Sequence, residues 1–137
     1  YRLAGFFDES LNDITLYMLY MGSPVISLYA AAKAMYDKGD YLKALSYINK
    51  VIEKEKGNPE YFLFRGNTYS HANMAKYAVK DYGMAVDLNS SLTEAWVNKG
   101  KARLATGDKN GACHDWQIAV QKGSSEAVQL LQEYCLK

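Results

Sequence analysis

The residues whose types could do chemistry gather near the C-terminal end, where Cys113, His114 and Asp115 are consecutive. Consecutive residues of a helix point about 100° apart, so these three side chains cannot converge on one substrate. Cys113 also falls on the inward stripe of a predicted helix, where a thiol packs as a small apolar group. The sequence therefore predicts no catalytic residue, and we expect that the chain is not an enzyme.

The two cysteines of the chain form a second chemical feature. Cys113 lies ten residues before Gly123, and Cys135 lies twelve residues after it. If two antiparallel helices meet at Gly123, the two thiols are nearly level, and a disulfide can form where their Cβ vectors agree. The alternative is a pair of buried, reduced thiols, because free cysteine packs well in a protein interior.

The sequence offers little support for binding of a metal, a cofactor, a nucleic acid or a membrane. His71 and His114 are far apart and have no cluster of cysteine or acidic residues beside them, so we expect no metal site. The chain has no glycine-rich phosphate-binding motif, and we expect no cofactor. Its net charge of +1, from 16 basic and 15 acidic residues, argues against a nucleic-acid-binding protein. No apolar run is long enough to cross a membrane, so we expect no direct membrane insertion.

The elements that position these residues recur every 34 residues. Three sets of equivalent positions show the period: Gly39, Asn73 and Gly107; Ala44, Ala78 and Ala112; and Ile48, Tyr82 and Trp116. Self-similarity at a fixed period marks a repeat protein. The apolar residues within each period follow helical spacing, so the sequence predicts an all-α fold in which each repeat is a pair of helices.

The period predicts a single domain over residues 1–137. Its predicted parts are a half repeat at 1–24, full repeats at 25–58, 59–92 and 93–126, and a capping helix at 125–136 that overlaps the end of the third repeat. The chain begins without methionine in the middle of the pattern, so we expect that it is a piece of a longer protein. The half repeat lacks its upstream helix, and its exposed apolar residues Phe7, Ile14 and Tyr17 could then drive formation of a homo-oligomer.

Small residues face large ones between the predicted helices. Ala32, Gly66 and Gly100 are equivalent, and a residue this small lets the second helix of a repeat approach the first closely. Large residues at the facing positions, such as Trp116, fill the remaining space. We therefore expect that a bulky side chain at Ala78 or Gly100 destabilises the fold by about 1–3 kcal/mol.

This pattern resembles the tetratricopeptide repeat. That family has a large residue, then glycine or alanine, then tyrosine on the first helix, glycine in the turn, and aromatic, alanine, aromatic and alanine on the second helix, followed by proline. The match covers essentially the whole chain, from Tyr1 to Glu126. Five residues depart from the pattern: Ala75, Ser90, Arg103, Lys109 and Ser124. The resemblance implies a right-handed superhelix of antiparallel helix pairs.

The resemblance also implies a partner-binding groove, built mainly from the first helix of each repeat. The implied groove residues are Tyr29, Lys33, Tyr36, Leu63, Phe64, Asn67, His71, Val97, Asn98, Lys101 and Leu104. One subset of the family grips a C-terminal carboxylate with lysine, asparagine and arginine, and here Tyr29, Phe64 and Glu94 hold three of those positions. We therefore expect a mixed groove that accepts an extended peptide or a helix with apolar anchors, and no carboxylate clamp.

The predicted function is a non-catalytic scaffold for protein–protein contacts, with a protein or peptide as partner. Two alternatives stay open: a structural module that self-assembles while the groove is idle, and a regulatory arm of a larger protein whose catalytic part lies outside this sequence. The run from Ala112 to Cys135 also resembles the closing repeat of bacterial tetratricopeptide proteins, many of which look like envelope or exported proteins. This second resemblance favours a disulfide between the two cysteines, and a periplasmic or exported location over a cytoplasmic one.

Overall fold

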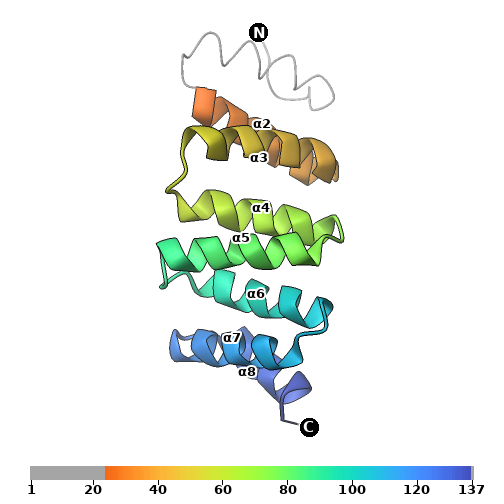
Figure 1. Cartoon of the computed structure of the whole chain (residues 1–137), viewed down its shortest axis with the longest axis vertical. Helices are drawn as coiled ribbons and strands as arrows, with labels where there is room; N and C mark the ends of the chain where they lie inside the picture. The colour runs from red at the N-terminus through yellow and green to blue at the C-terminus, as the bar shows by residue number, and fades with distance from the viewer. Residues whose placement is uncertain (1–23, 137) are drawn as a thin grey trace. The chain divides into compact units, whose positions relative to one another are not determined.

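The computed structural model describes residues 24–136, and these residues form seven α-helices and no strand (Figure 1). The helices are α2 (Pro24–Lys38), α3 (Tyr41–Lys54), α4 (Pro59–His71), α5 (Ala75–Leu88), α6 (Thr93–Ala105), α7 (Lys109–Gln121) and α8 (Ser125–Tyr134). The all-α prediction is confirmed, and both helices of each predicted full repeat are present. The predicted half repeat, with Phe7, Ile14 and Tyr17, lies outside the described residues.

The chain divides into two compact units, residues 1–56 and residues 57–137. In the described part of the first unit, α2 and α3 pack against each other as a helical hairpin. Its buried apolar residues recur at helical spacing, as the sequence predicts. They are Leu28, Ala31, Ala32, Met35, Ala44, Leu45, Ile48, Val51 and Ile52.

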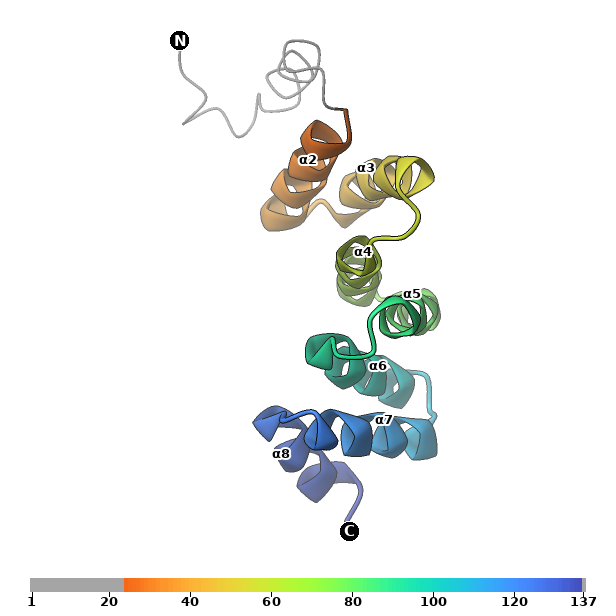
Figure 2. The ribbon, with the colours of Figure 1, turned by 90° about the vertical axis from the view of Figure 1, so that its left-hand side faces the viewer.

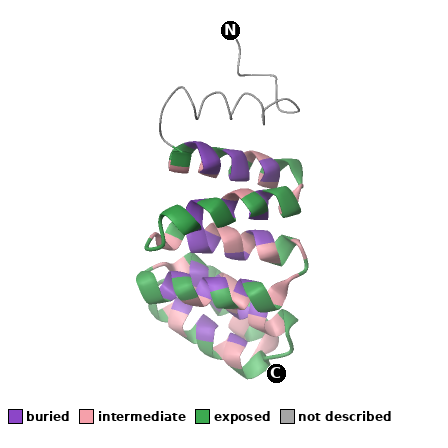
Figure 3. Ribbon diagram, turned by 45° about the horizontal axis from the view of Figure 1, so that its top comes forward, coloured by how far each residue is buried: buried purple, intermediate pink, exposed green. Residues whose placement is uncertain are grey.

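In the second unit, each helix from α4 to α8 packs against the next one along the chain, and α4 also touches α6. Figure 2 views α4 and α5 nearly along their axes, with the two helices side by side. Buried residues lie on the faces that neighbouring helices turn toward each other, and exposed residues lie on the outer faces (Figure 3). None of the described helices has the length and apolar character that a membrane span needs.

The turns between paired helices use the left-handed backbone region. Gly39, Asn73 and Gly107 lie one period apart and have φ angles of 89°, 62° and 92°. Glycine adopts this conformation without a clash at Cβ, and asparagine tolerates it better than most other residues. The backbone of the turn therefore explains why the 34-residue pattern has glycine or asparagine at this position.

Two glycines let large rings reach the facing helix in the second unit. A Cβ atom at Gly66 would lie 2.7 Å from Cε1 of Tyr82, and one at Gly100 would lie 2.7 Å from Cδ1 of Trp116. Both distances are too short for a real contact, so each ring packs directly on the backbone of the other helix. Trp116 is also held by a hydrogen bond of 3.1 Å from its Nε1 to the carbonyl oxygen of Val97. The predicted packing of small against large residues is therefore confirmed in these two repeats.

Helix α8 lies where the sequence predicts a capping helix, and it ends at Tyr134. Ala127 is fully buried, and Leu130, Leu131 and Tyr134 pack against the apolar cluster around Trp116. The ring centroids of Trp116 and Tyr134 lie 5.8 Å apart. Since only one residue of α8 is fully buried, this helix contributes less to the core than the helices before it.

Candidate functional site

The run Cys113–His114–Asp115 does not form a catalytic site. Cys113 is bonded to Cys135, His114 is exposed and Asp115 is buried, so the three side chains enter different environments. The disulfide joins the first half of α7 to the residue that follows α8, with the two Cα atoms 5.9 Å apart. It confirms the pairing that the second resemblance favours. Within residues 24–136, no group of three or more His, Cys, Asp or Glu residues is arranged to hold a metal ion.

Three of the implied groove residues lie on α2, in the first unit. Nζ of Lys33 lies 4.3 Å from the ring centroid of Tyr29, within range of a cation–π interaction. The ring of Tyr36 meets that of Tyr41 edge to face, with centroids 5.5 Å apart. Lys33 is exposed and both groove tyrosines are half-buried, so this face of α2 presents aromatic surface and one cation.

In the second unit, α4 and α6 are joined by a polar cluster, which we call the asparagine cluster. It contains Asn67, Ser70, Tyr82 and Asn98. Oδ1 of Asn67 accepts one hydrogen bond from the Tyr82 hydroxyl at 2.6 Å and another from Nδ2 of Asn98 at 3.1 Å. The Ser70 and Tyr82 hydroxyls lie 3.2 Å apart. The structure therefore brings together two implied groove residues, Asn67 and Asn98, and it fixes their orientation through a core tyrosine.

The other implied groove residues of this unit differ in how much surface they present. Leu63 and Val97 are only 5% and 3% exposed, so their side chains serve mainly in packing. Phe64 and Leu104 are half-buried, and His71 is exposed. A periodic pattern locates these positions on the first helices, but it does not show how deeply the neighbouring helices cover each one.

Lys101 lies on α6 and is paired with Glu126 at the start of α8, with Nζ 2.5 Å from Oε2. Both side chains are about half exposed, at 48% and 56%. An ion pair this exposed contributes little to stability, because water and salt screen it. Its consequence is positional: the groove cation on α6 lies beside an acid on α8.

Two buried ion pairs are features that the sequence reasoning missed. In the first, Arg65 of α4 holds the buried carboxylate of Asp81 of α5 through two hydrogen bonds, Nε–Oδ2 at 2.7 Å and Nη2–Oδ1 at 2.8 Å. Burial raises the pKa of the Asp81 carboxyl above its usual value, and the guanidinium opposes this rise. The hydrogen bond to Asp81 raises the pKa of Arg65 above its usual value. The paired geometry satisfies both carboxylate oxygens.

The second buried acid, Asp115, is held more loosely. It is 1% exposed, and its nearest cations are Nη1 of Arg103 at 3.4 Å and Nζ of Lys99 at 3.9 Å. No described group donates a hydrogen bond to its Oδ2. Burial raises the pKa of the Asp115 carboxyl above its usual value, while Lys99 and Arg103 oppose the rise. The signal that could have revealed both sites is the recurrence of a cation and an acid at the same two core positions, one period apart.

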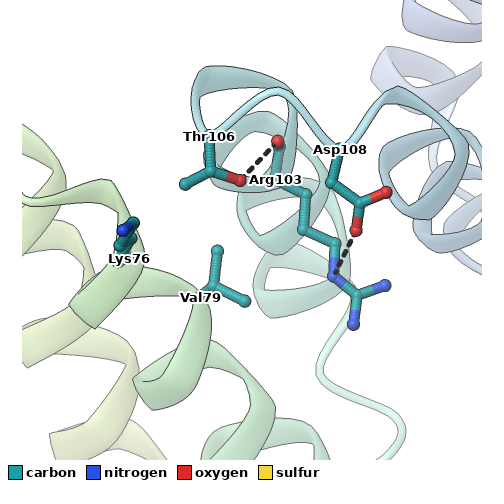
Figure 4. Close-up of a pocket in the computed structure, with 5 residues that line it drawn as sticks. All are labelled: Lys76, Val79, Arg103, Thr106 and Asp108. Carbon is teal, nitrogen blue, oxygen red and sulfur yellow. Dashed lines mark hydrogen bonds and ion pairs between the residues drawn. The ribbon is translucent and has the colours of Figure 1, made fainter.

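A surface cavity of about 410 Å³ lies beside Arg103. Figure 4 shows Lys76 and Val79 of α5 on one side of it, and Arg103, Thr106 and Asp108 on the other. The Thr106 hydroxyl donates to the carbonyl oxygen of Arg103 at 2.8 Å, and Nε of Arg103 lies 3.9 Å from Oδ2 of Asp108. Because this guanidinium already faces Asp108 on one side and the buried acid on the other, the cavity is a poor site for an anion.

No family model matches the chain, but two kinds of curated protein have similar sequences. Hsc70-interacting protein 1 of Drosophila melanogaster is 30% identical over 92 residues, which cover 67% of this chain and 24% of that protein. DnaJ homolog subfamily C member 7 of Mus musculus is 30% identical over 101 residues, which cover 74% of this chain and 20% of that protein. The chain thus spans about a quarter or less of the length of these relatives.

Solved structures with the same fold include domains that hold chaperone peptides. The first TPR domain of Spaghetti (RPAP3), bound to the HSP90 peptide SRMEEVD, has a TM-score of 0.76 at 24% identity over 80% of this chain and 89% of that one. The second TPR domain of human RPAP3, in complex with the HSP70 peptide SGPTIEEVD, has a TM-score of 0.78 at 24% identity over 83% of this chain and 97% of that one. MamA has a TM-score of 0.79 at 17% identity, over 87% of this chain and 70% of that one.

These neighbours have the fold that the periodic pattern predicts. Two of these solved tetratricopeptide domains hold peptides, as expected of the interaction module that the sequence predicts for this chain. With its 34-residue period, its paired helices and these likenesses, the chain is a tetratricopeptide repeat protein.

Proposed function

We propose that this chain is a protein-interaction domain without catalytic activity. It binds a peptide or a helix of a partner protein on the exposed face of the first helix of its repeats. The observation that carries the proposal is that domains of the same fold hold peptides of HSP90 and HSP70. Similar sequence segments also occur in curated proteins that are named for their association with Hsc70.

The asparagine cluster supports this proposal in the second unit. Oδ1 of Asn67 accepts two hydrogen bonds, but its Nδ2 donates to no residue in the described part of the chain. A fixed carboxamide with an open donor suits the backbone carbonyl groups of an extended peptide. Phe64 and Leu104 are half-buried residues of the same two helices, and they would supply apolar contacts beside the cluster.

The ligand class proposed here differs from that of the neighbours that hold acidic C-terminal peptides. Phe64 and Glu94 occupy two positions where the resemblance implies cationic or amide groups for a terminal carboxylate. Glu94 is exposed and would repel that carboxylate, while the ring of Phe64 cannot bond it. We therefore expect an internal peptide segment or a helix with apolar anchors as the ligand.

Selection from a random peptide library displayed on phage, followed by calorimetric titration, tests the proposal. We expect selected peptides to lose about tenfold in affinity for Asn98→Ala, because Asn98 helps to hold the Asn67 carboxamide in the orientation that presents its open donor. Asn110→Ala is the matched control, because Asn110 is exposed on α7, away from the cluster. Selected peptides that bind Asn98→Ala as well as the wild type would contradict this site.

The peptide SRMEEVD tests the ligand class separately. We expect no saturable binding, because Glu94 opposes its acidic C-terminus. Binding that disappears when the terminal carboxylate is amidated would show that a carboxylate clamp is present after all.

A homo-oligomer through Phe7, Ile14 and Tyr17 remains a second prediction, and it concerns residues outside those described. Light scattering during size exclusion tests it. A monomer at high protein concentration would contradict it and would leave peptide binding unaffected.

A further inference from the structure

The hairpin formed by α7 and α8 is closed at both of its ends. At one end the chain turns at Gly123, and the Ser124 side chain caps α8 by accepting a hydrogen bond from the backbone N of Ala127. At the other end, the disulfide joins Cys113 to Cys135, which are 22 residues apart. These are the only two cysteines of the chain, so α7 and α8 are the only helices that a disulfide links.

Without the disulfide, α8 has little to hold it. It is 10 residues long, and Ala127 is its only fully buried side chain. Leu130, Leu131 and Tyr134 are partly buried against α7 and its neighbours. An isolated helix of this length is marginal in water, because too few hydrogen bonds follow the costly first turn. The order of α8 therefore depends strongly on its covalent link.

Two contacts connect α8 to the groove residues of α6. Near the C-terminal end of α8, the ring of Tyr134 packs on Trp116, whose Nε1 donates to the carbonyl oxygen of Val97. At the N-terminal end of α8, Glu126 pairs with Lys101. Loss of α8 would thus free the ring that rests on α6 and would release the groove cation from its partner.

We propose that the Cys113–Cys135 disulfide is a redox latch, which keeps α8 ordered and thereby sets the shape and charge of the α6 part of the groove. A dithiol reductant opens the latch: two electrons and two protons convert the disulfide to two thiols, and the reductant is oxidised to its own disulfide. Helix α8 then frays from its C-terminal end and Trp116 becomes exposed to water. The effect on the groove depends on the proposed function, but the latch itself does not.

Hydrogen exchange of the whole chain, with no partner present, tests the latch directly. Alkylation and mass measurement first confirm that the oxidised protein has no free thiol and the reduced protein has two. Hydrogen exchange of the two forms is then compared. We expect the amides of residues 129–134 to exchange on the order of a hundredfold faster in the reduced chain, since a cross-link that closes a loop of this length is lost. The amides of α5 serve as an internal control, because α5 packs mainly against α4 and α6.

Tryptophan fluorescence gives a second readout. Trp96→Phe leaves Trp116 as the sole tryptophan, and we expect its emission to move to longer wavelength on reduction. Cys113→Ser/Cys135→Ser should behave like the reduced chain and should not respond to the reductant. Unchanged exchange of α8 and unchanged Trp116 emission, with two free thiols confirmed, would overturn the latch.

A peptide selected on the oxidised chain then tests the link to the groove. We expect about a tenfold loss of affinity on reduction, because a loosened α6 surface must be ordered again before it can bind. Equal affinity in both states, with α8 loosened, would overturn the control of the groove. If no peptide binds in either state, the proposed function fails, and the exchange data still decide whether the latch exists.

Discussion

The second and third full repeats, 59–92 and 93–126, place a buried acid at the same position but satisfy it differently. Asp81 receives two short hydrogen bonds from one arginine, Arg65. Asp115 lies one period later, and its cations are more distant, with one of its oxygens accepting no hydrogen bond. An aligned pair of charges offsets the loss of hydration on burial, whereas a loose one does so only in part. We infer that the same repeat position is well satisfied in one repeat and poorly satisfied in the next.

A second difference between the two repeats shows that two residues in contact with each other change together. In the second repeat, the rings of Tyr69 and Tyr77 stack with centroids 5.3 Å apart. One period later these positions hold Arg103 and Gly111, and a Cβ atom at Gly111 would lie 2.9 Å from Cδ of Arg103. Glycine thus makes room for the arginine that approaches the buried acid. The period determines which positions are in the core, while the chemistry at each position is settled locally.

The largest effect that we expect comes from breaking the tighter ion pair. Arg65→Met leaves Asp81 buried without its partner and should lower the free energy of unfolding by about 3 kcal/mol. Lys99→Met, at the equivalent position, should cost about 1 kcal/mol, because Arg103 still faces Asp115. Urea denaturation followed by circular dichroism measures both variants. Equal losses would contradict the contrast between the two repeats.

Both repeats share a glycine on which an aromatic ring packs, and a methyl group added at that glycine tests this contact. Gly100→Ala places a methyl group against the buried ring of Trp116 and should cost about 2 kcal/mol. Gly83→Ala is the matched control on a neighbouring helix, since its Cβ would meet nothing within 4 Å. That variant should gain up to about 1 kcal/mol from helix propensity. A neutral Gly100→Ala would show that Trp116 can move aside.

Converting the looser pair toward the tighter one should stabilise the protein. Lys99→Arg gives Asp115 the residue type that holds Asp81, and we expect a gain of about 1 kcal/mol from a two-pronged hydrogen bond. Thermal unfolding of the variant beside the wild type measures the change. A loss of stability would mean that Arg103 already fills the space that a second guanidinium needs.

The smallest effect that we expect is a dependence on pH. Burial raises the pKa of the Asp115 carboxyl in the folded state, so the folded protein takes up a proton at a higher pH than the unfolded chain does. The contribution of this group to stability therefore rises as pH falls through the folded pKa toward the ordinary value of 3.8. In unfolding experiments from pH 7 downward, the free energy of unfolding of Asp115→Asn should fall relative to that of the wild type. Asp87→Asn, at an exposed site, is the control, and a parallel pH dependence of the two variants would contradict the expectation.

Most of the fold could be predicted from the sequence, because the 34-residue period relates each helix of a full repeat to the equivalent helices of the two other full repeats. Glycine, asparagine and proline mark the helix ends, and the small residue at Gly100 reveals the close approach of a ring. Apolar periodicity is a strong signal here, since a helix with one buried face must repeat its apolar residues every three or four positions.

The candidate site could be predicted only as a set of positions. Burial of Leu63 and Val97, and the pairing of Asn67 with Asn98, depend on the fit between side chains of different helices, which a period does not specify. The buried pair of Arg65 and Asp81 was missed for a related reason. Charged residues usually lie on solvated faces, and only their partner across the helix interface makes such a position favourable.

The cross-link between α7 and α8 also bears on the order in which the second unit folds. Because the bond persists in the unfolded chain, the ends of this segment stay near each other, and closing this hairpin costs less conformational entropy than closing α4 on α5. Assembly should then begin at the C-terminal hairpin and spread toward α4, one neighbouring helix at a time. Pulse labelling during refolding would show the amides of 109–134 protected first, and simultaneous protection of α4 would contradict that order.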